Sequence, residues 1–454
     1  MPKIRPKHLH LVSLGCAKNT VDSDGMAQLL SRAGYKLAQS PARAEILLVN
    51  TCGFIGPARE ESLKVLNDLA AAKKPGQWLI AAGCLSQRYG ADLAREVPGL
   101  DGVIGTRRWM DIVDLVEHVR TRSAPEPLFH LPSEAATVGA DERGTLRAAV
   151  QGASAYLKIA DGCRRPCAFC AIPLIKGTAV SRPPDAIVAE ARQLEADDIR
   201  EIILIAQDTT DYGSDLGLKD ALPALLDQIT QAAPRLDWLR VMYAYPGCIS
   251  DRLIDLMASR PQILHYLDLP LQHAHPAVLR RMRRPADMDH VRETLAKMRA
   301  AMPDLALRST FIVGYPGETE AEFEALLGFV EEMQFDRVGV FTFSPEIGTA
   351  AADLGDTVPE DVKQARRSRL MEVQQRISLA RNEALVGRTL SVLVEGQGDG
   401  LSVGRSYRDA PEIDGLVIIE GDAPVGQLVE VHITGAMVYD VSGKLAQPPR
   451  GPAR

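Results

Sequence analysis

The sequence predicts an α/β protein with three domains: an N-terminal parallel α/β sheet domain, an incomplete (β/α)6 TIM-like barrel, and a small C-terminal antiparallel β-barrel. Three observations predict this arrangement. The length of 454 residues suits about three domains, since a domain averages about 150 residues. Through residues 8–381, short apolar runs alternate with helical stretches, which is typical of parallel sheets covered by helices. Beyond residue 382, short strand-like runs lie among glycines, as in small β-barrels.

The composition excludes two classes of protein. Hydrophobic residues make up 46% and charged residues 24%, which is ordinary for a globular protein. The net charge of −7 excludes a chain coated with basic residues for nucleic acid, although a local basic patch is compatible with it. No apolar stretch reaches the ~18–20 residues of a membrane span. The apolar run 9–15 contains His10 and Ser13 and is at the short limit of a signal core, so we expect a cytoplasmic protein.

The N-terminal domain is expected over residues 8–120. Its predicted strands are 9–14, 46–50 and 78–81, and its predicted helices are 21–33 and 57–72. Pro57 suits the first turn of a helix, where a missing backbone N–H leaves no bond unmade. Residues 121–148 have little periodicity and contain Pro125, Pro127 and Pro132, which predicts a linker.

The central domain is expected over residues 149–381 and the last domain over 382–448. Six strand candidates alternate with helical segments such as 184–196 and 319–333; these strands are 155–160, 202–207, 238–244, 264–269, 305–313 and 337–343. Six βα units suit a TIM-like barrel that does not close, with its site at the C-terminal strand ends. A long polar helix over 359–385 is then expected to leave the core. Strands at 390–394, 415–419 and 428–433 predict the small β-barrel.

Three cysteines follow the first predicted barrel strand with the spacing C-x3-C-x2-C: Cys163, Cys167 and Cys170. Three thiolates can hold a cubane iron–sulfur cluster through three irons and leave the fourth iron open. Soft thiolate ligands favour zinc or iron–sulfur. A zinc site would need a fourth ligand, and none follows locally. The spacing therefore favours an open iron–sulfur cluster over zinc or three unrelated buried cysteines.

Three further cysteines each follow one of the three predicted N-terminal strands: Cys16, Cys52 and Cys84. The ends of parallel strands meet at one edge of a sheet, so these side chains are expected to converge there. Neighbouring glycines would let the backbone approach a bulky group. The alternative is three buried core cysteines, since free cysteine is common in cores. We predict a second cluster. Cys248 belongs to neither set and is expected to be a buried thiol.

These residues are similar to those of a known family. The motif of Cys163, Cys167 and Cys170, with Phe169 in the aromatic position before the last cysteine, resembles the radical S-adenosylmethionine superfamily. With its second cysteine set, the whole chain over residues 8–448 resembles the methylthiotransferases, which end in a TRAM β-barrel. The resemblance implies two 4Fe-4S clusters, one for radical generation and one for sulfur delivery, and S-adenosylmethionine. It also implies a radical carried by the cofactor rather than by a catalytic side chain, and an electron donor such as flavodoxin or ferredoxin.

Other barrel positions carry weaker expectations about S-adenosylmethionine. Gln207 and Asp208 follow the second barrel strand, where the superfamily contacts the amino end of the ligand, although Asp208 could equally cap the next helix. Arg182 could pair with the ligand carboxylate or lie on the surface. Gly314 ends the fifth strand and is expected either beside the adenine or in a simple tight turn. His273 is expected to be structural.

The family divides between enzymes that act on tRNA adenosine and enzymes that act on an aspartate β-carbon in ribosomal protein uS12. Residues 382–448 contain ten acids and four Lys or Arg, which suits a basic protein better than phosphate. The segments 207–213, 243–246 and 405–415 also resemble the ribosomal-protein branch. We therefore expect uS12 as the substrate, with tRNA unlikely and a tRNA adenosine methylthiotransferase as the alternative. A plain iron–sulfur electron carrier is a more distant alternative.

Three acids near the end of the chain are expected to dock the basic substrate. Asp409, Glu412 and Asp414 lie in one loop-like stretch with Pro411, so we expect them to face solvent together. Their alternative role is turn chemistry, in which aspartate is common.

Overall fold

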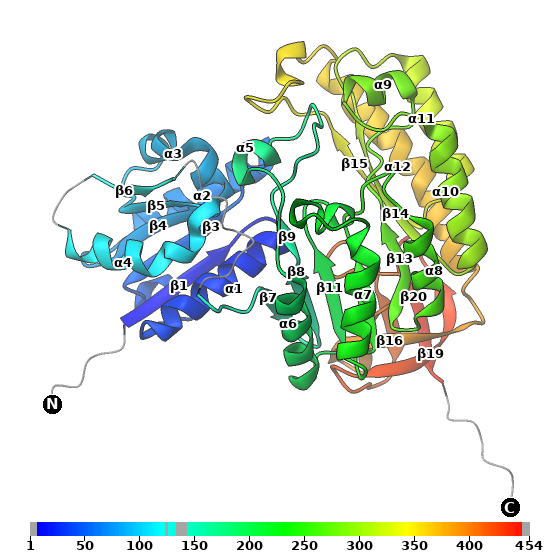
Figure 1. Ribbon diagram of the computed structural model, residues 1–454, viewed down its shortest axis with the longest axis horizontal. Helices are drawn as coiled ribbons and strands as arrows, with labels where there is room; N and C mark the ends of the chain where they lie inside the picture. The colour runs from blue at the N-terminus through cyan, green and yellow to red at the C-terminus, as the bar shows by residue number, and fades with distance from the viewer. Residues whose placement is uncertain (1–6, 123–125, 133–142, 447–454) are drawn as a thin grey trace, which may run out of the picture.

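The computed structural model describes residues 7–122, 126–132 and 143–446. Figure 1 shows the N-terminal domain in blue and cyan, beside a barrel in green and yellow whose lower end is covered by a small red β-barrel. Helix α1 (Ala17–Arg32) lies between the N-terminal sheet and the first strands of the barrel (Figure 1). The three-domain α/β fold expected from the sequence is confirmed.

The N-terminal sheet has six strands, all parallel, in the order β2-β1-β3-β4-β5-β6. The strands are β1 (Lys7–Ser13), β2 (Tyr35–Leu37), β3 (Ile46–Thr51), β4 (Trp78–Gly83), β5 (Gly102–Gly105) and β6 (Leu128–His130). The sequence predicted only β1, β3 and β4, because the other three strands are too short to show a pattern. Strand β6 pairs with β5, so the expectation that residues 121–148 form only a linker is wrong.

Helices cover both faces of this sheet, which explains why β3 is buried along its whole length. Helices α1 and α4 (Ile112–Thr121) pack on one face, through residues such as Met26, Leu30 and Val116. Helices α2 (Gly56–Ala72) and α3 (Cys84–Glu96) pack on the other, through Leu66 and Leu85. The carboxyl ends of β1, β3 and β4 are left at one edge, beside the barrel.

The central domain contains a seven-stranded sheet in the order β15-β14-β13-β12-β11-β8-β7. Its strands are β7 (Ala148–Gln151), β8 (Ser154–Lys158), β11 (Glu201–Ile205), β12 (Trp238–Val241), β13 (Ile263–Asp268), β14 (Ala306–Val313) and β15 (Arg337–Thr342). Strands β8 to β15 in this sheet are the six predicted parallel strands. Strand β7 was not predicted, and it forms an antiparallel hairpin with β8 around Gly152, whose φ is +59°.

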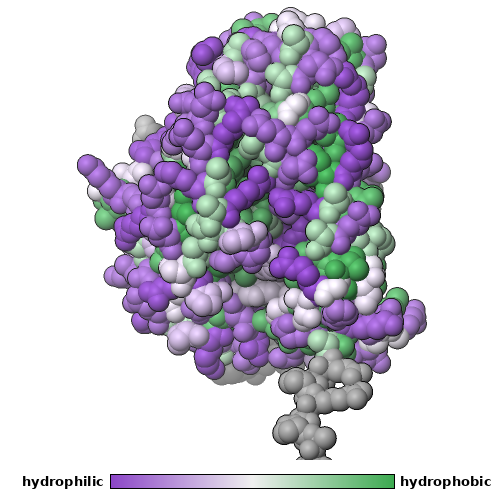
Figure 2. Space-filling view, turned by 90° about the vertical axis from the view of Figure 1, so that its right-hand side faces the viewer, coloured by the Kyte–Doolittle hydropathy of each residue, from purple (hydrophilic) through white to green (hydrophobic). Residues whose placement is uncertain are grey.

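Helices surround the outer side of the barrel sheet: α6 (Pro184–Ala196), α7 (Ala221–Ala232), α8 (Asp251–Ser259), α10 (Met288–Ala301) and α11 (Glu320–Met333). The face in Figure 2 is largely hydrophilic, with hydrophobic side chains in scattered groups, as expected where amphipathic helices turn their apolar sides inward. Helix α12 (Glu360–Glu383) does not leave the core as expected. It contributes Leu370, Val373 and Ile377 to the main core of the barrel, against β15.

Short elements hold the loop that follows the first barrel strands. Strands β9 (Ala160–Asp161) and β10 (Val180–Ser181) form a two-residue antiparallel pair that closes this loop at its base. Helix α5 (Ile172–Lys176) lies within the loop, and helix α9 (Pro276–Arg281) follows β13. The loop between β9 and α5 carries the first cysteine set.

The last domain is a closed barrel in the order β16-β17-β18-β20-β19. Its strands are β16 (Thr389–Gly398), β17 (Leu401–Ser406), β18 (Val417–Glu420), β19 (Leu428–Ala436) and β20 (Val441–Leu445). The pairing is antiparallel as predicted, except that β18 and β20 run parallel. A closed barrel leaves no free strand edge, so this small domain can present its outer surface without exposing unpaired backbone.

The end of β17 and the segment that follows it close the amino end of the central barrel. Arg405 contacts Glu201, at the start of β11, at 2.6 Å and the Ser154 hydroxyl, at the start of β8, at 3.0 Å. Asp409 binds Arg337, at the start of β15, at 2.7 Å. We call residues 405–414 the barrel plug.

The barrel plug corrects the expectation for the three docking acids. Asp409 is buried against Arg337, and the Asp414 carboxylate accepts the Tyr266 hydroxyl at 2.7 Å inside the barrel. Glu412 is exposed and bonds Gln151 at 3.0 Å. The three acids therefore do not face solvent together, because the acids on either side of Glu412 close the barrel instead.

Candidate functional site

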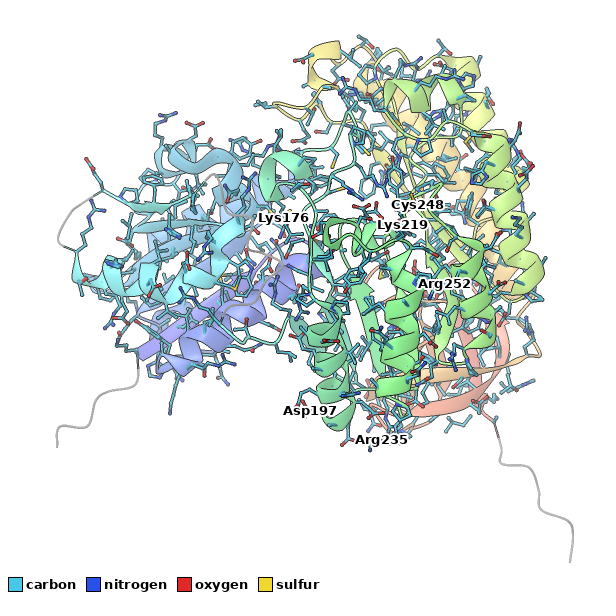
Figure 3. The ribbon with its side chains drawn as sticks, in the orientation of Figure 1. Lys176, Asp197, Lys219, Arg235, Cys248 and Arg252 are labelled. Atoms are coloured by element: carbon cyan, nitrogen blue, oxygen red, sulfur yellow. The ribbon has the colours of Figure 1, made fainter. Side chains whose placement is uncertain are left out.

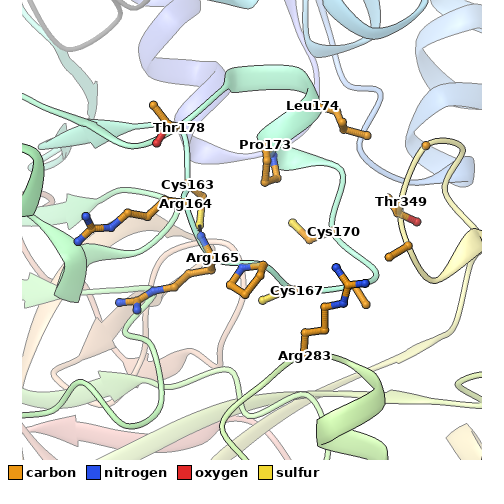
Figure 4. Close-up of a pocket in the computed structure, with 14 residues that line it drawn as sticks. Cys163, Arg164, Arg165, Cys167, Cys170, Pro173, Leu174, Thr178, Arg283 and Thr349 are labelled. Atoms are coloured by element: carbon orange, nitrogen blue, oxygen red, sulfur yellow. Dashed lines mark hydrogen bonds between the residues drawn. The ribbon is translucent and has the colours of Figure 1, made fainter.

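The first cysteine set surrounds one cavity. Cys163, Cys167 and Cys170 line a space of about 410 Å³ in the loop between β9 and α5. Figure 4 shows their three sulfur atoms around a common space, with Arg165 and Arg283 nearby. Burial raises the pKa of the Cys163 thiol to about 11 and that of Cys170 to about 12. Three half-buried thiols on one cavity fit a group that binds them as thiolates and replaces their protons.

The loop is held by its backbone and by arginines. Gly162 has φ of +74°, and a side chain there would overlap the carbonyl of Thr178, so glycine is required at this position. The Cys163 N–H donates to the Gly177 carbonyl at 3.1 Å. Arg284 donates to the Cys167 sulfur at 3.6 Å. These contacts help to position Cys163 and Cys167 in the loop.

The second cysteine set lies at the carboxyl edge of the N-terminal sheet, as expected. Cys16 follows β1 and precedes α1, Cys52 follows β3, and Cys84 begins α3. A Cβ on Gly15 would lie 2.8 Å from the Cβ of Cys52, so the backbone approaches that cysteine closely. Asn19 links the segments that carry Cys52 and Cys84. Its amide donates to the Thr51 carbonyl at 3.0 Å, and its oxygen accepts from the Cys84 sulfur at 3.6 Å.

The donor chemistry of both sets fits iron–sulfur clusters. Each set offers three thiols and a backbone close enough to enclose a bulky group. In the described part of the chain, no three His, Cys, Asp or Glu side chains are placed to share a single metal ion. A cubane does not require that placement, because each thiolate binds a different iron. The residues that would hold the clusters are the six cysteines predicted from the sequence.

The two cysteine sets lie on either side of one domain interface. Cys84 packs directly on Ala171 and Ile175, which follow the last cysteine of the first set. Arg88 of α3 reaches across to Glu346 of the barrel at 2.6 Å, with both side chains largely buried. The interface therefore brings the sulfur-rich edge of one domain against the sulfur-rich loop of the other.

A buried ionic network fixes this interface. Asp22 of α1 pairs with Lys158 of β8 and with Lys176 of α5, the latter at 3.1 Å. Asp161 pairs with the same two lysines at 3.2 and 3.1 Å. Arg147 adds a contact to Asp161 at 2.8 Å. Figure 3 shows Lys176 where the two domains meet. Burial favours the neutral carboxyl, but the lysines outweigh it and hold the pKa of Asp161 well below its ordinary value.

A larger apolar cavity adjoins the first cysteine set. Its volume is about 460 Å³, and Phe169, Gln272 and Phe343 of the barrel line it together with Phe54 and Ile55 of the N-terminal domain. Phe169 is therefore half-buried at a cavity rather than enclosed in the core. A mostly apolar cavity with a few polar groups is typical of small-molecule sites.

The other residues expected near S-adenosylmethionine differ in whether the protein itself supplies their hydrogen-bond partners. Gln207 has both amide atoms buried without a hydrogen-bond partner among the described residues, which suits a side chain that binds a ligand. Asp208 caps the short helical turn Thr209–Asp211 and pairs with Arg165 at 2.6 Å. Gly314 has φ of +72° and lies in a tight turn against Lys363.

The structure corrects both expectations for Arg182. It is neither on the surface nor free to bind a carboxylate, because its guanidinium pairs with Glu190 at 2.6 and 2.8 Å and donates to the Lys158 carbonyl at 2.8 Å. His273 is buried and bonds Glu318 at 3.3 Å, consistent with a structural role. Cys248 is half-buried and accepts from Arg165 at 3.3 Å, so it is not the buried thiol expected.

One residue of the interface was missed by the sequence analysis. Lys18 lies in the first turn of α1 and is 9% exposed, with its Nζ 3.2 Å from the centroid of the Tyr243 ring. Burial lowers the pKa of its ammonium group, and nearby Cys16 and Asp268 oppose that effect. A lysine two residues after a cysteine carries no sequence signal of burial, so only the packing of α1 on the barrel reveals it.

Comparisons with known proteins agree with the fold. Residues 8–105 match the uncharacterized protein family UPF0004, residues 157–330 the radical SAM superfamily, and residues 386–445 the TRAM domain. A solved structure of the radical S-adenosylmethionine methyltransferase TsrM from Kitasatospora setae has a TM-score of 0.57 at 13% identity, covering 87% of this chain and 79% of that one. This likeness concerns the fold alone.

Curated relatives cover nearly the whole chain. A protein of Chloroflexus aurantiacus named ribosomal protein uS12 methylthiotransferase RimO is 52% identical over 96% of this chain and 99% of its own length. A protein of the same name from a Roseiflexus species is 50% identical over 98% of each chain. None of the helices in the described residues is long and apolar enough to cross a membrane. With its three domains matched in order and its length covered by such relatives, the chain belongs to the RimO family of ribosomal protein uS12 methylthiotransferases.

Proposed function

We propose that this chain is a radical S-adenosylmethionine enzyme that methylthiolates the β-carbon of an aspartate in ribosomal protein uS12. The observation that carries the proposal is the contact of Cys84 with Ala171 and Ile175, which puts a second set of three cysteines against the loop of the radical motif. A radical enzyme that only abstracts hydrogen would not need that second set. Its relatives named for uS12 support the choice of substrate.

Each part of the chain has a distinct task in this reaction. When bound, two 4Fe-4S clusters and S-adenosylmethionine supply the hydrogen-abstracting radical and the methylated sulfur. Cys163, Cys167 and Cys170 would hold the radical cluster, and Cys16, Cys52 and Cys84 the sulfur-delivery cluster. The apolar lining of the cavity around Phe169 would limit the access of water to a carbon that binds there. The ionic network of Asp22 keeps both cysteine sets at a constant separation.

The surface charge of the small β-barrel supports a protein substrate over tRNA. Residues 382–446 expose seven acids and two bases, because Arg405 and Arg408 are buried. Binding of phosphates depends on exposed Lys and Arg. The exposed net charge of −5 therefore repels tRNA at this domain and attracts a basic protein. The reaction also requires an external electron donor, such as flavodoxin or ferredoxin, and we place it in the cytoplasm with its ribosomal substrate.

The substrate can be tested by mass spectrometry of uS12 from a deletion strain with and without this gene. The expected result is a mass increase for one methylthio group on an aspartate, present only with the gene. A modified tRNA adenosine with unmodified uS12 would contradict the proposal and support the tRNA alternative.

Cysteine variants separate the two clusters. Cys163→Ala should abolish the cleavage of S-adenosylmethionine to 5′-deoxyadenosine, because the radical cluster loses one of its three anchors. Its iron content after anaerobic reconstitution should be roughly half that of the wild type, since the other cluster persists. Replacing Cys16, Cys52 and Cys84 together should instead stop methylthio transfer while 5′-deoxyadenosine still forms. Cys248→Ala is the matched control and should change neither product. Methylthio transfer by the triple variant would remove the second set from the mechanism.

A further inference from the structure

Lys18 extends from the N-terminal domain toward the barrel. Helical spacing puts Ala17, Lys18, Val21 and Asp22 on one side of α1. Ala17 and Val21 pack into the core cluster that lines the barrel, and Asp22 pairs with Lys158 and Lys176. Lys18 is therefore held on the barrel side of the interface, two residues from Cys16.

In the described residues, no carboxylate lies within ion-pair distance of the Lys18 ammonium group, although Asp268 is nearby. In the parts of the chain that the structure describes, the other buried lysines each pair with a carboxylate: Lys158 and Lys176 with Asp22 and Asp161, and Lys363 with Asp356. Lys18 forms no such pair within those residues, and its Nζ contacts the face of Tyr243 at 3.2 Å from the ring centroid. A buried charge without a partner is costly, so an anion that binds beside it gains affinity.

Tyr243 places this ammonium at the functional end of the barrel. Tyr243 has φ of +60°, an uncommon conformation for a bulky residue that tends to occur at ligand sites. Its carbonyl accepts from the Thr209 N–H at 3.1 Å, and its N–H donates to Asp268 at 3.3 Å. These neighbours follow or end β11 and β13, so the Tyr243 ring lies at the carboxyl ends of the strands, where barrel enzymes bind their substrates.

We propose that Lys18 binds the side-chain carboxylate of the aspartate that receives the methylthio group, an inference that rests on the proposed function. The carboxylate carbon of an aspartate is bonded directly to its β-carbon. The group that holds the carboxylate must therefore lie within a few ångströms of the reacting carbon. Lys18 meets this requirement because it stands between Cys16, which belongs to the sulfur-delivery set, and the mouth of the radical barrel.

Other cations near the barrel are less suitable. Arg308 pairs with Asp268 at 2.9 Å, Arg165 with Asp208 at 2.6 Å, and Arg182 with Glu190 at 2.6 Å. Arg283 and Arg367 line the two cavities but are exposed, and an exposed cation contributes little to binding a carboxylate. Among the buried lysines that the structure describes, Lys18 needs no broken ion pair before it can bind a substrate, and the half-buried Arg284 already donates to the Cys167 sulfur and the Pro270 carbonyl.

The experiment compares two peptides that span the target aspartate of uS12, one with aspartate and one with asparagine at that position. Binding is measured anaerobically by fluorescence anisotropy with the reconstituted full-length enzyme, and methylthio product by mass spectrometry. Asparagine keeps the shape of aspartate and removes its charge. The variants are Lys18→Met, Lys18→Arg and the matched control Lys64→Met, since Lys64 is an exposed lysine of the same domain.

The wild type and Lys64→Met should bind the aspartate peptide about tenfold or more tightly than the asparagine peptide, the size expected for a buried charge pair. Lys18→Met should lose this preference and bind both peptides with the affinity that the wild type has for the asparagine peptide. Lys18→Arg should retain part of the preference for aspartate. Lys18→Met breaks no ion pair and leaves no carboxylate without its partner, so a folding failure is not expected.

Full retention of the aspartate preference by Lys18→Met would overturn the role of Lys18, as would equal binding of both peptides by the wild type. Equal loss of affinity for both peptides in Lys18→Met would also overturn it, because it would indicate a structural role. Wild-type enzyme that binds and modifies neither peptide would instead overturn the proposed function.

Discussion

The polar side chains near the expected ligand sites are of two kinds: some have hydrogen-bond or ion-pair partners within the protein, and others have none. Arg182 and Asp208 lie where a ligand was expected, but both are occupied by protein partners. The Gln207 amide is buried without a hydrogen-bond partner among the described residues, and Lys18 is buried there without an ion pair. Because buried polar groups are almost always paired, an unsatisfied one is a better indicator of ligand binding than its position after a strand.

Gln207 allows this distinction to be tested. Gln207→Leu should weaken binding of S-adenosylmethionine about tenfold, the size expected for one or two lost hydrogen bonds. Thermal stability should be unchanged or slightly higher, because no bond within the protein is lost. Calorimetric titration and thermal unfolding measure the two effects. Gln231→Leu, at an exposed position on α7, is the control. A destabilised Gln207→Leu with normal ligand affinity would show that the amide serves the fold.

At the level of elements, the barrel plug joins the small β-barrel to the central one. The Glu201 carboxylate accepts three hydrogen bonds. They come from Arg240 at 2.7 Å, from Arg405 of the barrel plug at 2.6 Å and from the Ser154 hydroxyl at 2.9 Å. Burial alone would raise the pKa of Glu201, but Arg240 and Arg405 outweigh it and hold the pKa at about 2. The contact of Arg405 with Glu201 thus stabilises the junction between the two barrels.

Glu201 should make the stability of the chain depend on acid pH. Its folded pKa of about 2 lies below its ordinary value of 4.5, so its contribution is present above pH 4.5 and is lost as the pH falls toward 2. Glu201→Gln should be less stable by about 3–5 kcal/mol at neutral pH, because two buried arginines lose their charge partner. This difference should shrink as the pH falls. Unfolding midpoints across the acid range measure it, with exposed Glu372→Gln as the control. A difference independent of pH would contradict this assignment.

The whole molecule depends on the placement of one domain against another. In the proposed reaction, one cysteine set serves radical generation and the other serves sulfur delivery, so both must reach the same substrate carbon. The separation between the sets is maintained by Asp22, Lys158, Asp161 and Lys176, all of them buried, and by the Arg88–Glu346 pair. Such a network restricts the relative motion of the domains, because a displaced charge would be left buried without a partner.

Asp22→Asn should uncouple the two halves of the reaction. Formation of 5′-deoxyadenosine should continue, whereas methylthio product per 5′-deoxyadenosine should fall by about 10²-fold, the loss expected from a misplacement of about 1 Å. The ratio of the two products, measured by mass spectrometry, distinguishes this effect from partial loss of enzyme. Asp68→Asn, on the exposed side of α2, is the control. An unchanged ratio in Asp22→Asn would show that the network has no part in alignment.

The sequence by itself determined the domain order, the six parallel barrel strands and the grouping of six cysteines in two sets, because these depend on local periodicity and on short spacings. It missed β2, β5 and β6, whose three or four residues are too few to show a pattern. Only the tertiary structure decided where charged side chains go. Arg405 meets Glu201 across 204 residues of chain, and Lys18 meets Tyr243 across two domains. Burial of a charge depends on which distant segments pack around it, and no local pattern of residues records that.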